Sequence, residues 1–254
     1  MLQQRKDNQI IAIPMKARPI HFLALGLALL FAGGSATASA GIVISNFNTD
    51  LDGWTLSDND PASTLTYIST GGNPGGFIQF SDAAQGANDV FSAPAKFLGN
   101  DSTFLNGTLS FDLAHNEPAE DISTTPLVIM DTSGDNLSLI LSAPATSNSP
   151  YTWTSYSFAL NTTTGFIFDG GTNSSNGFIL SGGTLATQVQ INTVLNNVSS
   201  ILLPADMHSG TELTGLDNFA LSSSSVPEPS TWGLLAGGAA ALFATLRRRV
   251  NQTA

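Results

Sequence analysis

The stretch T-L-S-F-D-L at residues 108–113 alternates polar and apolar side chains without a break. Because successive side chains of a β-strand point to opposite faces, this pattern predicts a strand with one buried and one solvated face. Further short apolar runs have strand character, at residues 77–80, 137–141, 151–160 and 198–203. Glycine-rich turn signals lie between them. Many short strands separated by such turns predict an all-β chain, folded as an antiparallel sandwich of the jelly-roll type.

One stretch has the spacing of a helix instead. Ile191, Val194, Leu195 and Val198 recur at intervals of three and four residues. That spacing predicts one short helix within residues 186–198.

Charge is distributed unevenly along the 254-residue chain. Residues 41–226 hold 17 acidic residues and a single basic residue, Lys96, which gives a formal charge of −16. A surface this acidic repels phosphates, so we expect no nucleic acid partner. The chain has no cysteine, which excludes disulfides, thiol nucleophiles and zinc sites with thiolate ligands.

The first 40 residues have the organisation of a secretory signal peptide. A basic segment that starts at Met15 precedes an apolar, helical core at residues 20–31, and Ala38 and Ala40 form a small-residue exit. We expect residues 1–40 to be removed by signal peptidase after the secretion machinery has exported the chain, with Met15 as the true start. The alternative, a transmembrane anchor, is disfavoured because the apolar core is short.

The segment at residues 226–250 has a different organisation. Its apolar run at residues 232–246 is 15 residues long, shorter than the roughly 20 that cross a hydrocarbon core comfortably. Polar and basic residues flank that predicted hydrophobic helix: Val226, Pro227, Glu228 and Pro229 precede it, and Arg247, Arg248 and Arg249 follow it. The arginines favour a cytoplasmic end. We expect this segment to be held briefly in the inner membrane and then cut; the alternative is a permanent anchor.

The Val-Pro-Glu-Pro stretch, the apolar run and the arginine cluster together resemble the PEP-CTERM sorting signal of exported bacterial proteins. The resemblance implies cleavage near the Pro-Glu-Pro by a membrane protease of the exosortase type. It also implies a Gram-negative bacterium that makes extracellular polysaccharide, and delivery of the protein to the cell surface or extracellular matrix.

Residues 41–225 resemble the laminin B domain (laminin domain IV), a galactose-binding-like β-sandwich. Four segments carry this resemblance in their order and spacing, at residues 47–54, 91–100, 107–113 and 198–221. The domain is therefore expected to occupy nearly the whole chain between the two signals.

The densest group of ionisable residues is Asp112, His115, Glu117, Glu120 and Asp121. Two carboxylates and a histidine can act as general acid and base, as in glycoside hydrolysis. The group follows a predicted strand in a polar, proline-containing segment, where charged side chains are usually solvated. We therefore expect no catalytic residues here.

A structural calcium ion is the cofactor that the residues suggest most directly, because calcium binds oxygen ligands from acidic loops. Asp50 and Asp52 near the first strand and Asp217 near the last would meet if the two termini of the domain are adjacent. Asn46 stands where a further carboxylate would serve. The alternative is that Asp217 makes only a turn.

Three aromatic residues between positions 151 and 156 suggest a surface on which sugars stack. Tyr151 and Trp153 are predicted to point to one face of a strand, and Tyr156 to the other. Packing in the core or at an edge is the expected role for each, with the sugar surface as the alternative.

These observations favour a non-enzymatic exported protein with an adhesive or structural role, in contact with extracellular polysaccharide or surface proteins. A carbohydrate-binding module with a defined sugar site is the first alternative. A polysaccharide hydrolase that uses residues 112–121 is the second.

Overall fold

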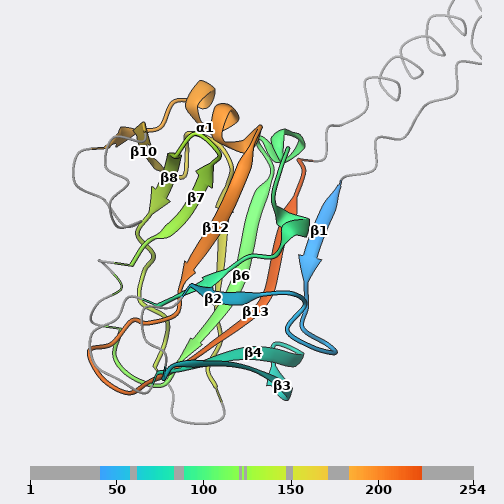
Figure 1. Ribbon diagram of the computed structural model, residues 1–254, viewed down its shortest axis with the longest axis vertical. Helices are drawn as coiled ribbons and strands as arrows, with labels where there is room; N and C mark the ends of the chain where they lie inside the picture. Colours follow the sequence, from blue (N-terminus) through green and yellow to red (C-terminus); the bar gives the residue numbers. More distant parts are fainter. Residues whose placement is uncertain are drawn as a thin grey trace, which may run out of the picture. The chain divides into compact units, whose positions relative to one another are not determined.

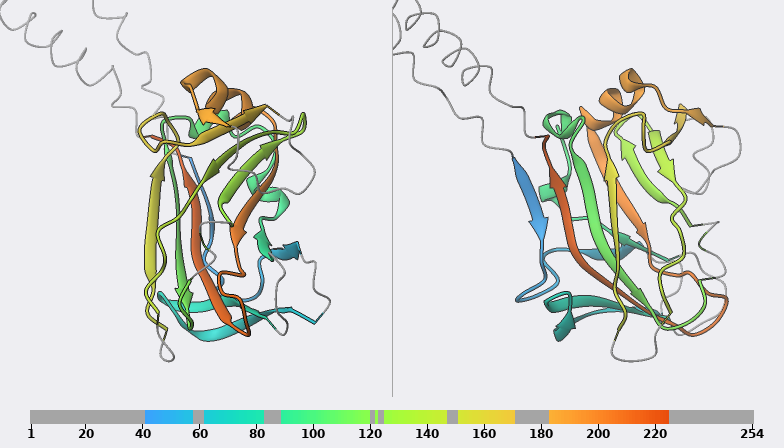
Figure 2. Two further views of the ribbon diagram at one scale, coloured as in Figure 1. Left: turned by 90° about the vertical axis from the view of Figure 1, so that its left-hand side faces the viewer. Right: turned by 180° about the vertical axis from the view of Figure 1, so that it is seen from behind.

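The computed structural model describes residues 41–57, 62–82, 89–119, 122, 125–146, 151–170 and 183–224. The predicted signal peptide and the sorting segment lie outside these residues, as do Glu120 and Asp121. Within the described part of the chain, two antiparallel β-sheets stack face to face, as Figures 1 and 2 show. The predicted antiparallel sandwich is therefore confirmed.

Sheet A contains the longest strands. Its order is β3-β4-β13-β6-β9, and β1 pairs with the half of β13 that β4 leaves open. Its strands are β1 (Ile42–Ser45), β3 (Thr64–Gly72), β4 (Gly75–Ser81), β6 (Thr108–His115), β9 (Thr154–Ala159) and β13 (Leu213–Ser222). The first and the last strand of the domain are thus neighbours.

Sheet B has the order β11-β10-β8-β7-β12-β5-β2. Its strands are β2 (Thr55–Ser57), β5 (Val90–Ser92), β7 (Leu127–Asp131), β8 (Asp135–Leu139), β10 (Ile167–Gly170), β11 (Thr184–Leu185) and β12 (Val198–Pro204). Two 3-10 turns, η1 (Ala95–Phe97) and η2 (Ser102–Phe104), connect the sheets along the chain between β5 and β6.

The single α-helix among the described residues, α1 (Gln188–Leu195), is shorter than predicted. Thr187 caps its start: the Thr187 hydroxyl accepts from the backbone N–H of Gln190, and the Gln190 side chain accepts from the backbone N–H of Thr187. This reciprocal pair satisfies two donors that a helix start leaves open. Val198, which the sequence pattern placed both at the end of the helix and at the start of the strand at residues 198–203, begins β12 and pairs with Asp131. No helix in the described part of the chain is long and apolar enough to span a membrane.

The core between the sheets is rich in aromatic rings. Trp54 meets Phe219 edge-to-face at 4.9 Å between ring centroids, and Phe97 meets Phe219 in the same way at 4.7 Å. The indole N–H of Trp54 donates to the Ser45 hydroxyl at 2.9 Å, so its polar atom is satisfied although the residue is buried. Trp54, Phe97 and Phe219 come from three of the four segments that carry the laminin B resemblance. Those segments are therefore recognisable because they build this part of the core.

Candidate functional site

The predicted calcium ligands each have a protein partner. The Asn46 side chain accepts from the backbone two residues on at 3.4 Å, and the Asp50 carboxylate accepts from the backbone N–H of Asp52 at 2.7 Å. Asp52 forms an ion pair with Lys96. Among the described residues, no three acidic or histidine side chains are grouped to hold a metal ion. Calcium binding by Asn46, Asp50, Asp52 and Asp217 therefore stays a prediction from the sequence.

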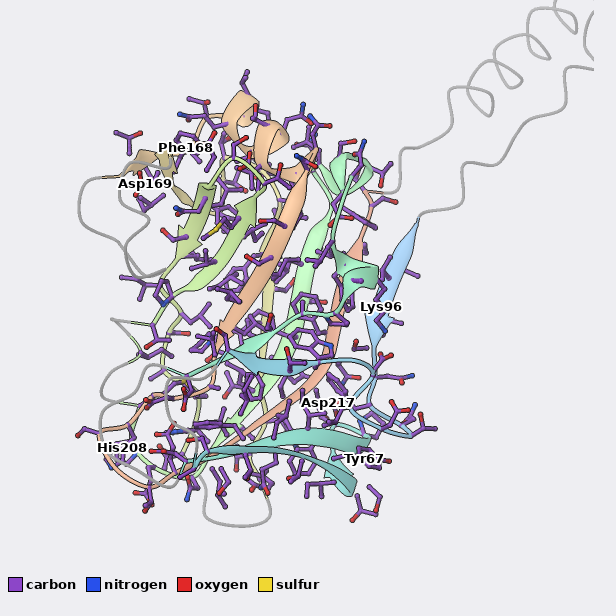
Figure 3. The ribbon with its side chains drawn as sticks, in the orientation of Figure 1. Tyr67, Lys96, Phe168, Asp169, His208 and Asp217 are labelled. Atoms are coloured by element: carbon purple, nitrogen blue, oxygen red, sulfur yellow. The ribbon has the colours of Figure 1, made fainter. Side chains whose placement is uncertain are left out.

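Lys96 fastens the opening loop to η1. Its ammonium group donates to the carbonyl of Ile44 at 2.7 Å, pairs with Asp52, and lies 5.1 Å from the centroid of the Phe97 ring. Figure 3 shows it beside β1. Because this ion pair is about one third exposed, it contributes little to stability. The single basic residue of the domain is thus engaged within the fold.

Asp217 and Asp112 lie opposite each other on β13 and β6. Their strand neighbours, Leu216 and Leu113, point into the core, so both carboxylates point to the outer face of sheet A. They are nevertheless almost completely buried, at 0% and 6% exposure.

Two asparagines hold this carboxylate pair. The side-chain amides of Asn218 and Asn73 donate to Asp112 at 2.8 and 3.2 Å, and their backbone N–H groups donate to Asp217 at 2.7 and 2.6 Å. Asn218 has a left-handed backbone, with φ of 50°, where β13 slips by one residue against β6. Asparagine tolerates that conformation better than most residues.

Burial raises the pKa of Asp217 to about 6. The backbone hydrogen bonds from Asn73 and Asn218 act against this shift, and the nearby Asp112 charge adds to it. The hydrogen bonds from Asn73 therefore fix the β3–β4 turn to β13 and β6, at the cost of burying two carboxylates next to each other.

The predicted acid–base group does not assemble. Asp112 lies in the strand predicted at residues 108–113, whereas His115, expected in the solvated segment after it, also belongs to β6, and both side chains are buried. Asp112 and His115 are three positions apart along β6, an odd offset, so Asp112 points outward while His115 points inward. His115 lies with its Nε2 atom 3.2 Å from Glu212, and its Nδ1 atom contacts the Glu117 carbonyl. The described members therefore do not converge on one reacting centre.

A second group of buried carboxylates gathers where strands of both sheets meet their connecting loops. Asp82 follows β4, Asp89 precedes β5, Asp206 follows β12 and Glu212 precedes β13, and all four are at most 7% exposed. Burial, together with the charges of Glu212, Asp82 and Asp89, raises the pKa of Asp206 to about 7, although a backbone hydrogen bond from His208 acts against this shift. The sequence did not predict this group, because its members are far apart in the chain.

The outer face of sheet A carries an exposed aromatic cluster. We define the aromatic face as Phe77, Gln79, Tyr151 and Trp153. Phe77 is buried, and its ring meets Tyr151 and Trp153 edge-to-face at 5.2 Å between centroids in each case. Tyr151 and Trp153 themselves remain partly exposed.

Hydrogen bonds fix the two exposed rings in place. The Gln79 amide donates to the Tyr151 hydroxyl, and the Trp153 indole N–H donates to the Gly71 carbonyl at 3.0 Å. Burial raises the pKa of Tyr151 above its ordinary value, which the Gln79 bond partly offsets. Two rigid, half-exposed rings beside amide and hydroxyl groups are suited to stacking against sugar rings.

The aromatic face adjoins the Asp112–Asp217 pair. Gly215, two residues before Asp217, provides the space for Trp153: a Cβ atom at Gly215 would lie 2.9 Å from the Trp153 ring and 3.2 Å from Phe77. Gly72, which follows the Trp153 acceptor Gly71, similarly approaches Asp217. The aromatic face and the buried carboxylate pair thus adjoin each other on the outer side of sheet A.

The prediction for the three aromatics is confirmed in its geometry. Tyr156 lies in the core, stacked on Phe111 at 5.1 Å with its hydroxyl donating to the Ser142 carbonyl, while Tyr151 and Trp153 lie on the outer face. Phe77 was missed as their support. Period-two alternation in residues 77–80 was the signal that could have placed it opposite Ile78.

Comparisons with protein families gave two matches. The model of the laminin B (Domain IV) family matches residues 90–236, and that of the PEP-CTERM protein-sorting motif matches residues 225–249. The sorting motif indicates an exported protein. No curated protein matches the sequence.

Several solved structures are similar to the chain. The L4b domain of human laminin alpha-2 is 12% identical over 54% of this chain and 70% of that one, with a TM-score of 0.43. The family 11 carbohydrate-binding module of a Clostridium thermocellum cellulase is 15% identical over 74% and 97%, with a TM-score of 0.44. An exo-beta-agarase is 14% identical over 73% and 25%, with a TM-score of 0.45. At such identities the similarity concerns the fold alone.

Proposed function

Because the chain belongs to the laminin B (domain IV) family and carries a PEP-CTERM sorting motif, we propose that it is an exported adhesive or structural protein of the cell surface or extracellular matrix. It is made by a Gram-negative bacterium, exported by the secretion machinery and cut by signal peptidase. The sorting segment then holds it in the inner membrane until an exosortase-type protease removes the tail.

The aromatic face is the surface through which the protein contacts extracellular polysaccharide. The observation that carries this proposal is the pair of partly exposed rings, Tyr151 and Trp153, supported from beneath by Phe77 and fixed by hydrogen bonds to Gln79 and Gly71. Rings that are already ordered lose little conformational entropy on binding, which favours affinity.

The charge of the domain indicates which class of polysaccharide it binds. A formal charge of −16 over residues 41–226 opposes polymers rich in uronic acid, sulfate or phosphate. The buried carboxylates Asp112 and Asp217 lie directly beside the aromatic face and add to this effect. Neutral polysaccharides are therefore the proposed ligands.

Binding without turnover is the mode that the described ionisable groups support. Asp112 is held by Asn73 and Asn218 on the outer face, whereas His115 contacts Glu212 on the inner side of the same sheet. A glycoside hydrolase needs two accessible carboxylates placed about one sugar ring, whereas the pair beside the aromatic face, Asp112 and Asp217, is 6% and 0% exposed and accepts hydrogen bonds from Asn73 and Asn218. This geometry favours an adhesive role over the hydrolase alternative.

The test is affinity electrophoresis of the exported protein in gels that contain neutral or acidic polysaccharides. Trp153→Ala should weaken retention by a neutral polysaccharide about tenfold, equivalent to about 1.4 kcal/mol, because one of two stacking rings is lost. Acidic polysaccharides should retain the wild-type protein little.

Phe168→Ala is the matched control, because Phe168 is a partly buried ring on the other sheet, labelled in Figure 3. It should leave retention unchanged. Unaltered retention of Trp153→Ala, or an equal loss in both variants, would contradict the assignment of the aromatic face.

A further inference from the structure

The two ends of the described domain are hydrogen-bonded to each other. The backbone N–H of Gly41 donates to the Ser223 hydroxyl at 2.8 Å, and the backbone N–H of Ser223 donates to the Gly41 carbonyl at 2.8 Å. Gly41 is the residue that predicted signal-peptide cleavage after Ala40 would leave first. Residue 225, where the sorting motif begins, follows Ser223 by two positions. The chain therefore enters and leaves the sandwich at one place, next to both predicted processing sites.

Four strands of sheet A end together at this place. Ser222 on β13 is paired with Ile42 at the start of β1 and with Thr108 at the start of β6, and Thr108 is paired with Ala159 at the end of β9. Figures 1 and 2 show the start of β1 beside the end of β13. We define the terminal end as residues 41–43, 102–108, 159–164 and 222–224.

The terminal end differs in charge from the rest of the domain. Its residues include no acidic, basic or histidine side chain, whereas residues 41–226 carry 17 acidic residues. The nearest carboxyl in the sequence, Asp101, is buried at 6% exposure. Exposed groups at this end are Ser, Thr and Asn, together with Ile42, which is 61% exposed.

The opposite ends of these strands carry carboxylates, unlike the terminal end. Glu117 follows β6, Glu212 precedes β13 and Asp82 follows β4, and the pairing of Thr214 with His115 places these segments together. His208, labelled in Figure 3, lies in the loop at that end. Within sheet A these carboxylates lie away from the place where the chain leaves it, whereas on sheet B Asp131 and Asp135 flank the β7–β8 turn near Val198, which is bridged to Gly99 beside the terminal end.

The chain between the sandwich and the membrane segment is short. Pro227 is three residues after Ser224, a reach of at most about 11 Å, and the apolar run begins at Trp232, at most about 29 Å away. The repulsion between carboxylates and anionic phospholipid extends about one Debye length, 8–10 Å at moderate salt. A domain on such a tether repeatedly meets the membrane surface.

We propose that the terminal end is a membrane-facing surface, on which the sandwich rests against the phospholipid bilayer while the sorting segment still tethers it. The four segments of the terminal end carry no charged side chain, so they meet anionic lipid without direct repulsion, and Ile42 supplies an apolar contact. The orientation leaves the motif within reach of a protease in the membrane and directs the carboxylates at the other end of sheet A, such as Glu117, away from it. This inference rests on the sorting motif and is independent of polysaccharide binding.

Single-cysteine labelling tests this orientation, because the chain contains no cysteine of its own. Thr162→Cys places a thiol on an exposed residue of the terminal end, and Ser209→Cys places one on an exposed residue of the opposite loop. Each full-length variant is made in a bacterium without a sorting protease. Its labelling by a bulky maleimide polymer is compared on isolated membranes and on the tail-free exported form.

Thr162→Cys should react several-fold more slowly on membranes than in the tail-free form, and Ser209→Cys should react equally fast in both. Equal rates for Thr162→Cys, or equal slowing of both thiols, would overturn the proposal. Slowing that occurs only when the sorting protease is co-expressed would assign the surface to that protein and not to lipid. Recovery of the full-length chain outside the membrane fraction would show that the sorting segment does not tether the domain, and this would overturn the proposal.

Discussion

The two faces of sheet A both carry aromatic rings, yet they use them differently. On the inner face, Phe219 of β13 packs against Trp54 and Phe97, which come from outside this sheet, and all three rings are at most 1% exposed. On the outer face, Phe77 is buried under Tyr151 and Trp153, which remain partly exposed. Strand parity decides to which set a ring belongs. The inner set maintains the fold, whereas the outer set is ordered but still available to a ligand.

The largest effect that separates the two faces is expected from Phe219→Ala. Removing this ring leaves a cavity among Trp54, Phe97 and Phe111, so the free energy of unfolding should fall by about 3–5 kcal/mol. Urea denaturation of the exported protein measures that loss. The matched substitution on the outer face is Trp153→Ala, which should cost clearly less stability because its ring is already partly exposed. Equal losses would mean that the two faces do not differ in role.

The inner face could be predicted from local sequence pattern. The alternation at residues 108–113 became β6, and the runs at 77–80 and 198–203 lie within β4 and β12. Alternation works here because a strand buries every second residue. Val198 suited both the predicted helix and the predicted strand, and pairing with Asp131 places it in the strand.

The outer face could be predicted only in part. The position of Tyr151 and Trp153 relative to Tyr156 follows from parity, but their support by Phe77 depends on which strands are neighbours. The hydrogen bonds of the Asp112–Asp217 pair could not be predicted from local pattern at all, because Asn73 is 144 residues from Asp217 in the sequence. Such contacts depend on the order of the strands and on the bulge at Asn218, and neither can be read from the periodicity of the sequence.

An effect of intermediate size is expected on the pH dependence of stability. It tests the outer face of sheet A, because Asp217 lies on that face. Burial raises its pKa to about 6 from the model-peptide value of 3.8, so the folded protein binds the proton more tightly than the unfolded chain does. This contribution is fully present below pH 3.8 and is lost as the pH rises through 6. Stability should therefore fall by on the order of 1–3 kcal/mol across that window.

Asp101 and Asp206, whose pKa values burial raises to about 6 and about 7, act in the same direction and extend the fall towards pH 7. Thermal melts between pH 4 and pH 7.5 measure the total, and Asp217→Asn should flatten the part between pH 4 and pH 6. A melting temperature that rises across this window, or a slope that Asp217→Asn leaves intact, would contradict the assignment.

The smallest change in stability is expected from Gly215→Ala, and it isolates the outer face most cleanly. The new methyl group would lie 2.9 Å from the Trp153 ring, closer than real contacts allow, so the ring has to move. Trp153 is partly exposed and can shift outward, whereas Phe77 beneath it cannot. Strain from the added methyl is partly offset by the lower entropy of the unfolded chain, so stability should change by less than about 1 kcal/mol.

Polysaccharide retention should nevertheless weaken, because the displaced indole loses its hydrogen bond to Gly71 and its edge contact with Phe77. Gly210→Ala is the control: its methyl group would lie 3.4 Å from His208 in the loop at the far end of the strands, an ordinary contact. Affinity electrophoresis and thermal melts of both variants separate binding from folding. If Gly215→Ala binds as the wild type does, then the position of Trp153 does not matter to the ligand, and the outer rings would be packing residues like those of the inner face.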